Sequence, residues 1–144
     1  MSAYFDSAII IKLYVQEINS PHAAGLVSSY PAPAPLTTWQ ALEVKNAIRL
    51  KAFRKEITTG EMTQSITAFE QDIASKRWAR PNYDVVTIEQ KAEELSASHA
   101  ASLGCRTLDI IHVAAAVVIG VNDFITFDNR QAALAKLSGL VVKS

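Results

Sequence analysis

The sequence predicts an α/β protein in which helices cover both faces of a mostly parallel sheet, a three-layer α/β/α sandwich. Three observations support this prediction. Short apolar runs alternate with longer segments of helical periodicity along most of the chain. The apolar runs are continuous rather than alternating, which is typical of parallel strands that are buried on both faces. The intervening segments are long enough for crossover helices, and right-handed crossovers favour an open layered sheet.

Prolines, glycines and capping residues predict where the elements begin and end. Pro21 follows residues that cap helices well, and Thr38 can cap the next long helix. Gly104 and Gly120 are placed to end two later helices, and the prolines of residues 31–35 exclude a helix there. We expect strands at residues 3–5, 36–37, 83–87, 123–127 and 140–142. We expect helices at residues 8–16, 21–27, 39–54, 61–78, 89–103, 109–119 and 130–137.

Composition bounds the class of protein. The chain has 144 residues, of which 49% are hydrophobic, so we expect one domain over residues 1–144 with a real core. Fourteen basic and fourteen acidic residues cancel, so binding to nucleic acid would need a local gathering of positive charge. The single cysteine, Cys105, excludes a disulfide framework. Because no signal-peptide pattern or bilayer-length apolar stretch is visible, we expect a cytoplasmic protein with no membrane partner.

Four acidic residues occupy positions that a functional site would use. Asp6 and Asp128 each follow an apolar strand and precede a helix, and the carboxyl ends of parallel strands share one edge of a sheet. Asp109 begins a helix that is apolar nearly all round. Glu43 shares a helix face with apolar residues, where a carboxylate is costly unless something compensates for it. The apolar members of that face are Trp39, Ala47 and Leu50.

Clustered carboxylates would repel one another without a counter-charge. Hard oxygen ligands with few sulfur or imidazole donors select Mg²⁺ or Mn²⁺, and such a cation can activate water for cleavage of a phosphodiester. For each acid alone, a helix cap, a turn or a surface charge would be the simpler explanation. Their joint placement favours a catalytic metal site. Its predicted ligands are Asp6, Glu43, Asp109 and Asp128.

Polar residues beside these acids are candidates for contacting substrate phosphates. Ser7 directly follows Asp6, and Asn129 and Arg130 are the two residues after Asp128. Lys45 and Arg49 belong to the basic run, defined here as the five basic residues within positions 45–55. This run is either a phosphate-binding surface or a solvated helix face. Its members are Lys45, Arg49, Lys51, Arg54 and Lys55.

Two other residue types favour structural roles. His112 lies one turn after Asp109 and could orient it, but a buried histidine with a satisfied hydrogen bond is the simpler interpretation. Trp39 and Trp78 are interpreted as core residues, and Cys105 as a small buried side chain.

Three segments resemble the N-terminal, middle and C-terminal signatures of PIN-domain proteins, especially VapC-like toxins: YFDSAIIIKLYVQE, TTWQALEVKNAI and TLDIIHVAAAVVIGVNDFITFDNRQAALA. The resemblance covers essentially the whole chain in the right order. It implies a PIN-like fold and a Mg²⁺-dependent endoribonuclease, usually homodimeric, whose toxin members are held inactive by a small cognate antitoxin. The matching acids are Asp6, Glu43, Asp109 and Asp128. Toxin members commonly carry a hydroxyl residue where this chain has Ala8.

Other functions fit less well. A phosphatase with Asp6 as nucleophile usually has a second Asp two residues later, where this chain has Ala8. A dinucleotide-binding protein needs a glycine-rich first turn, which the sequence lacks. A housekeeping RNA-processing nuclease of PIN type and a catalytically idle nucleic-acid-binding module stay open. The former would usually carry extra RNA-binding segments, and the latter would be expected to lack one of the acids.

Overall fold

The computed structural model describes residues 2–144 and divides into two compact units. The sheet unit comprises Met1–Asp6 and Pro81–Ser144, and the helical unit comprises Ser7–Arg80. Within residues 2–144, every helix is too short or too polar to cross a lipid bilayer.

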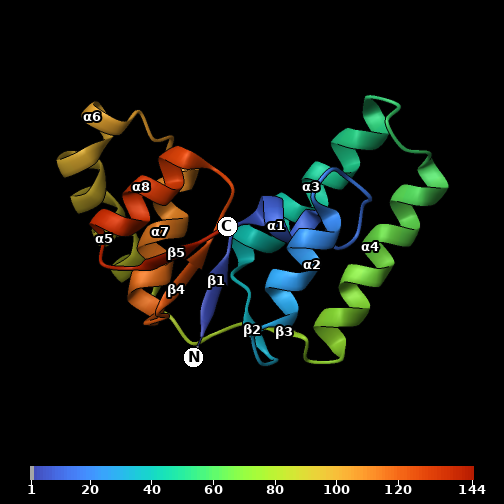
Figure 1. Cartoon of the computed structure of the whole chain (residues 1–144), viewed down its shortest axis with the longest axis horizontal. Coiled ribbons are helices and arrows are strands. Elements are labelled where there is room, and N and C mark those ends of the chain that lie inside the picture. The colour runs from blue at the N-terminus through green and yellow to red at the C-terminus, as the bar shows by residue number, and fades with distance from the viewer. Residues whose placement is uncertain (1) are drawn as a thin grey trace. The chain divides into compact units, whose positions relative to one another are not determined.

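The sheet unit is built on three parallel strands (Figure 1). These are β1 (Ala3–Phe5), β4 (Asp123–Ile125) and β5 (Val141–Lys143), in the order β1-β4-β5. The side chains of β1 and β4 are all buried, as expected for strands with continuous apolar runs. The expected α/β class and parallel pairing are confirmed, whereas a three-layer arrangement of the whole chain stays a prediction.

Helices supply much of the core of the sheet unit. Helix α7 (Thr107–Ile119) packs against α5 (Val85–Leu95) and α8 (Asn129–Leu137). Helix α8 connects β4 to the parallel β5, which makes a β-α-β crossover. A short π-helical turn (Ser96–Ala100) and α6 (Ala101–Leu103) continue α5. The buried side chains of α7 are Ile110, His112, Val113, Ala114, Ala115 and Ala116.

The predicted strand at residues 83–87 is wrong, because α5 already begins at Val85. The valines and threonine of this segment favour a strand by propensity. Asp84 overrides that preference: its carboxylate accepts a 3.1 Å hydrogen bond from the Thr87 backbone N–H and caps the helix. At the far end, Gly104 ends the helical segment with φ of 69°, as the sequence predicted.

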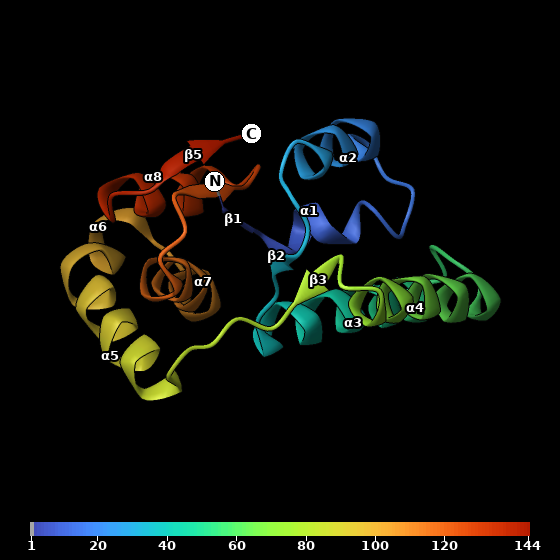
Figure 2. The same ribbon diagram turned by 90° about the horizontal axis from the view of Figure 1, so that it is seen from below.

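The helical unit contains four helices and a two-stranded parallel sheet. The helices are α1 (Ser7–Ile11), α2 (Ser20–Ser28), α3 (Thr38–Phe53) and α4 (Thr59–Ala74). Strands β2 (Ala34–Pro35) and β3 (Trp78–Ala79) pair with each other. Helix α3 packs against α1 and against α4, which lies beside it in Figure 2.

Several predicted boundaries in the helical unit are wrong for local reasons. The long helix is capped by Thr37 rather than Thr38, because Thr37 and Gln40 form a reciprocal capping box. The helix expected over residues 61–78 ends at Ala74, and Lys76 then adopts a left-handed φ of 67°. Trp78 therefore lies in β3, fully buried. The first helix ends at Ile11 rather than near residue 16, and the short strand expected at residues 36–37 lies at Ala34–Pro35.

Candidate functional site

The register of the sheet places Asp6 beside Thr126. Phe5 pairs with Ile125 at the carboxyl ends of the parallel β1 and β4. The backbone N–H of Asp6 donates a 2.9 Å hydrogen bond to the Ile125 carbonyl, so the pairing continues one residue past the strand end. Asp6 and the segment leading to Asp128 therefore emerge at the same edge of the sheet, as the sequence predicted.

Thr126 connects two of the predicted acids. Its hydroxyl Oγ1 lies 3.1 Å from Asp6 Oδ2 and accepts a 3.0 Å hydrogen bond from the Asp128 backbone N–H. Thr126 is 1% exposed, so these polar contacts are shielded from water. Thr126 belongs to the C-terminal segment that resembles PIN-domain proteins, but it was not predicted as a site residue. The signal for it was its place directly after β4, level with the residue that follows β1.

Asp109 and Asp128 line one pocket of the sheet unit, of about 630 Å³ and open to solvent. Asp109 lies in the first turn of α7, and Asp128 caps α8 by accepting a 2.8 Å hydrogen bond from the Gln131 backbone N–H. The helix cap engages one carboxylate oxygen of Asp128. The position of this oxygen is therefore explained by capping and does not by itself indicate a functional site. The remaining lining residues are Gly104, Arg106, Phe127, Asn129 and Arg130.

The pocket mixes carboxylates with guanidinium groups. Arg106 Nε lies 3.6 Å from Asp109 Oδ2 at the exposed start of α7. Arg130 lies beside Gly104, since a side-chain carbon built on that glycine would be 4.0 Å from Arg130 Nη1. Two guanidinium groups therefore line the same pocket as the two carboxylates, and a phosphate contact of Arg130 stays a prediction.

The thiol of Cys105 lies close to the charged groups of this pocket. Partial burial raises the pKa of its thiol, and the nearby carboxylates of Asp109 and Asp128 raise it further. The thiol donates a long hydrogen bond, 3.7 Å, to the Arg130 carbonyl. Cys105 is only half-buried rather than a core residue, so its predicted packing role is only partly confirmed.

Glu43 lies in the helical unit, where Ser7 is its partner. Ser7 Oγ donates a 2.8 Å hydrogen bond to Glu43 Oε1. Ser7 is buried as the first residue of α1, and Glu43 is half-buried on α3. The proton of the Ser7 hydroxyl, a predicted phosphate contact, is thus donated to Glu43.

The predicted apolar face around Glu43 is wrong by one position along the helix. The buried face of α3 consists of Gln40, Val44 and Ile48. Leu50 is 39% exposed, and Glu43 borders the buried face rather than lying in the middle of it. The burial of Glu43 therefore supports a role in a functional site less strongly than the sequence pattern did. The case for that role now rests on the hydrogen bond between Glu43 and Ser7.

The arrangement of side chains bears on the predicted metal site. Among residues 2–144, no three His, Cys, Asp or Glu side chains lie close enough together to hold one metal ion. The chemistry of the donors nevertheless fits Mg²⁺, which keeps several waters and commonly binds through only one or two carboxylates. Asp109 and Asp128, which share a pocket, supply such a pair.

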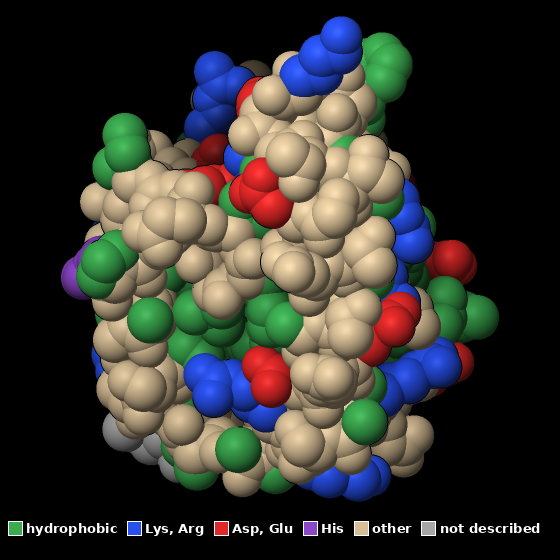
Figure 3. Space-filling view, turned by 90° about the vertical axis from the view of Figure 1, so that its right-hand side faces the viewer, with side chains coloured by type: hydrophobic (Ala, Val, Ile, Leu, Met, Phe, Trp, Pro, Cys, Tyr) green, Lys and Arg blue, Asp and Glu red, His purple; other side chains and the backbone are tan. Residues whose placement is uncertain are grey.

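The basic run is partly neutralised within the helical unit. Lys45 Nζ lies 2.8 Å from Glu70, and Lys51 Nζ lies 2.7 Å from Glu17 and 3.3 Å from Glu56. Figure 3 shows Lys and Arg side chains interspersed with Asp and Glu on the face that it draws. The sequence, which lacks acids between positions 45 and 55, could not reveal pairing with acids from other segments.

His112 has a structural role. It is 1% exposed, and its Nδ1 lies 2.7 Å from the hydroxyl of the buried Tyr4 on β1. This contact ties α7 to the sheet and confirms the simpler of the two interpretations of His112.

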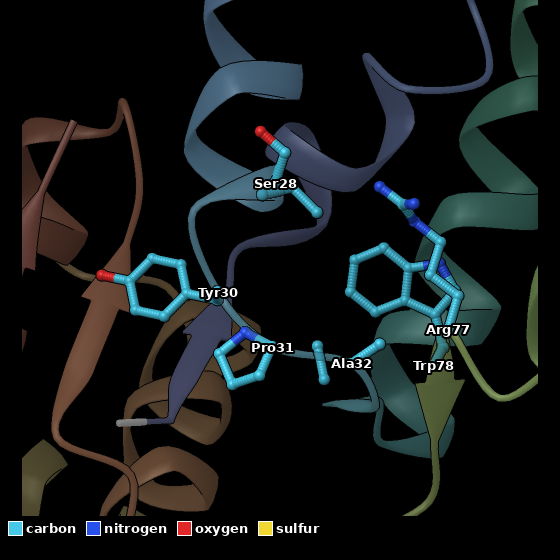
Figure 4. A pocket seen from close by; sticks show the side chains of 8 residues that line it. Ser28, Tyr30, Pro31, Ala32, Arg77 and Trp78 are labelled. Atoms are coloured by element: carbon cyan, nitrogen blue, oxygen red, sulfur yellow. The ribbon is translucent and has the colours of Figure 1, made fainter.

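A second pocket, of about 490 Å³, lies within the helical unit (Figure 4). Its wall combines Tyr30, Pro31 and Trp78 with the Arg77 side chain at one side (Figure 4). Among the described residues that line it there is no carboxylate, so the chemistry predicted from the sequence does not belong here. The neighbouring Tyr14 hydroxyl is engaged by Asp72 at 2.6 Å and by the Trp78 indole at 2.7 Å.

No protein-family model matches this chain, and no curated protein matches its sequence.

Proposed function

We propose that this protein is a metal-dependent endoribonuclease. The observation that carries the proposal is the pocket of the sheet unit, where Asp109 and Asp128 lie together with Arg106 and Arg130. Carboxylates can hold a hydrated divalent cation, and guanidinium groups bind phosphate oxygens. This combination suits a phosphodiester substrate better than a neutral one.

Asp6 extends the pair of acids to three within the sheet unit. It lies at the same strand edge and is linked to the backbone of Asp128 through the Thr126 hydroxyl. In the proposed enzyme the pair Asp109 and Asp128 would hold a hydrated Mg²⁺ or Mn²⁺. Asp6 and Glu43 complete the set of four proposed acids on the strength of their sequence segments. The bound cation would supply an activated water and charge neutralisation at the scissile phosphate.

The protein's own groups have separate parts in this proposal. Arg130 and Asn129 follow Asp128 in the pocket lining and would position a phosphate of the RNA. Arg106, whose side chain is 84% exposed, can turn from Asp109 toward an incoming strand. Lys45 and Arg49 would contact the RNA backbone as part of the basic run.

The resemblance of three segments to VapC-like toxins extends the proposal. In this form the enzyme is the toxin of a toxin–antitoxin pair in the cytoplasm, functions as a homodimer and is inhibited by a small cognate antitoxin protein. A basic side chain of such a partner could compete with the cation for Asp109 and Asp128, because both are positive.

The test is cleavage of a labelled mixture of cellular RNAs by the purified protein, with Mg²⁺, with Mn²⁺ and with EDTA. We expect cleavage with either cation, none with EDTA, and a loss of at least about 100-fold in Asp109→Asn. The matched control is Glu89→Gln, an exposed acid on α5 outside the pocket, which should cut at the wild-type rate. Equal cleavage by Asp109→Asn and the wild type would refute the site.

A further inference from the structure

Thr126 Oγ1 has three polar neighbours and only one proton to donate. The backbone N–H of Asp128 donates to it at 3.0 Å. Asp6 Oδ2 and Gln131 Oε1 both lie 3.1 Å from it, and both are oxygen acceptors. A hydroxyl carries one proton and two lone pairs, so it can satisfy only one of these two oxygens. The other would face the hydroxyl oxygen with no proton between them.

The side-chain amide of Gln131 has the opposite problem, a donor that lacks an acceptor. Gln131 is 1% exposed, and its Nε2 has no hydrogen-bond partner among residues 2–144. A buried amide nitrogen without an acceptor costs roughly 1–3 kcal/mol, so this arrangement is unfavourable. The oxygen and nitrogen of a glutamine amide exchange places by a half-turn of the amide group, which leaves the shape of the side chain unchanged.

One rotation resolves the conflict at Thr126. With the amide turned, Gln131 Nε2 donates to one lone pair of Thr126 Oγ1. The second lone pair of Oγ1 accepts from the Asp128 backbone N–H. The hydroxyl proton of Thr126 is then donated to Asp6 Oδ2. The hydroxyl then makes one donated and two accepted hydrogen bonds, which is its full capacity. Gln131 Oε1 takes the unpartnered place, where a carbonyl oxygen is tolerated better than an N–H group.

We propose that Gln131 is a positioning residue of the candidate site, acting through the Thr126 hydroxyl on Asp6. This inference rests on the proposed ribonuclease function. Its side chain commits the Thr126 proton to Asp6, and its backbone N–H donates to Asp128 Oδ1 at 2.8 Å. A single residue therefore holds two of the predicted metal ligands. Outer groups that orient metal-binding carboxylates typically change metal affinity or activity about 10- to 100-fold when removed.

The hydrogen bond itself is tested without any assay of activity. In nuclear magnetic resonance spectra of the metal-free protein, one Gln131 side-chain N–H should exchange slowly and show an Overhauser contact to Thr126. Thr126→Ser should keep this signature, and Thr126→Val should abolish it because valine has no hydroxyl. A Gln131 amide with fast-exchanging protons and no contact to Thr126 would overturn the proposal.

The positioning role is tested by kinetics. Gln131→Met keeps the approximate volume of the side chain and removes the donor. We expect kcat for RNA cleavage to fall about 10-fold or more while KM stays within about two-fold. The control Gln90→Met, at an exposed position of α5, should leave both unchanged. A KM effect alone, or wild-type kcat in a folded Gln131→Met, would refute the role.

The two proposals fail in different ways. If the wild-type protein cuts no RNA, the ribonuclease function fails, and the Gln131–Thr126 hydrogen bond is still decided by the resonance measurement. If the wild type cuts RNA and the resonance signature is absent, only the role of Gln131 fails. Should Gln131→Met not fold, the measurements on the wild type, Thr126→Ser and Thr126→Val still decide whether the hydrogen bond exists.

Discussion

The Ser7 hydroxyl donates a hydrogen bond of 2.8 Å to Glu43, which joins the start of α1 to the middle of α3. Ser7 directly follows Asp6 in the chain and is buried. The contact gives Glu43 a structural partner, so a loss of activity on changing Glu43 has two explanations that must be separated.

The variant Glu43→Gln separates a catalytic role of Glu43 from a structural one. Glutamine keeps an oxygen that can accept from Ser7 and removes only the charge, so we expect nearly wild-type stability with strongly reduced RNA cleavage. Ser7→Ala should do the opposite: it should lower the free energy of unfolding by about 1–2 kcal/mol, because Glu43 loses a part-buried donor. Urea denaturation and cleavage rates measure the two effects. Full activity of Glu43→Gln would show that Glu43 has only a structural role.

We expect each acid of the pocket in the sheet unit to contribute to metal binding. Mn²⁺, as a paramagnetic probe, should broaden the resonances of residues around the pocket lined by Asp109 and Asp128 at low molar ratio. Asp128→Asn should weaken this effect by about 10-fold or more, while the cap to Gln131 survives because asparagine also caps helices. Broadening confined to some other part of the molecule would contradict the assignment of the site.

The unpaired part of the basic run should govern RNA affinity more than the paired part. Lys45 and Lys51 are held by acids, whereas no ion pair of Arg54 or Lys55 is found within residues 2–144. In an inactive Asp109→Asn background, Arg54→Ala with Lys55→Ala should weaken RNA binding. The slope of log K against log salt should become shallower by about 0.7 for each RNA phosphate that the variant no longer neutralises.

The control for this experiment is Lys136→Ala, an exposed lysine of the sheet unit. It should leave the salt slope unchanged. An unaltered slope in the Arg54/Lys55 variant would identify the basic run as a solvated helix face.

Glu17 should make stability depend on pH in the acid range. Burial alone would raise the Glu17 pKa, but hydrogen bonds from Lys12 and Lys51 outweigh it and lower the pKa below 4.5. Stability from a lowered carboxyl pKa is fully present above the unfolded value and is lost as pH falls through the folded value. We expect Glu17→Gln to be less stable by roughly 1 kcal/mol at pH 7, with the difference vanishing well below pH 4.5.

Thermal or urea unfolding of both proteins from pH 7 to pH 3 measures this difference. A constant gap over the whole range would show that the Glu17 charge contributes nothing and that only packing changed.

Expression in bacterial cells distinguishes a toxin from a housekeeping nuclease. Induction of the wild-type protein should arrest growth, and Asp109→Asn at equal soluble yield should not. Normal growth with abundant, soluble protein that cuts RNA in vitro would favour the housekeeping nuclease.

Features that depend on neighbouring residues could be predicted from the sequence. The glycines that end helices, the aspartates that follow β1 and β4, and the alternation of strands with helices all depend on neighbouring residues along the chain. The sequence therefore predicted Gly104, Gly120 and the shared strand edge of Asp6 and Asp128 correctly. The strand expected at residues 83–87 failed because one capping carboxylate outweighed the β-propensity of its neighbours.

Only the tertiary structure decided which polar groups meet across the chain. Thr126 is 120 residues from Asp6, and their contact depends on the register of two parallel strands. The pairing of Lys51 with Glu17 and the burial of Gln131 likewise depend on how separate elements pack. Sequence by itself determined where carboxylates and helix ends occur, because those are local properties. The fold determined which of these groups share a proton, since hydrogen bonds form between atoms that are close in space rather than along the chain.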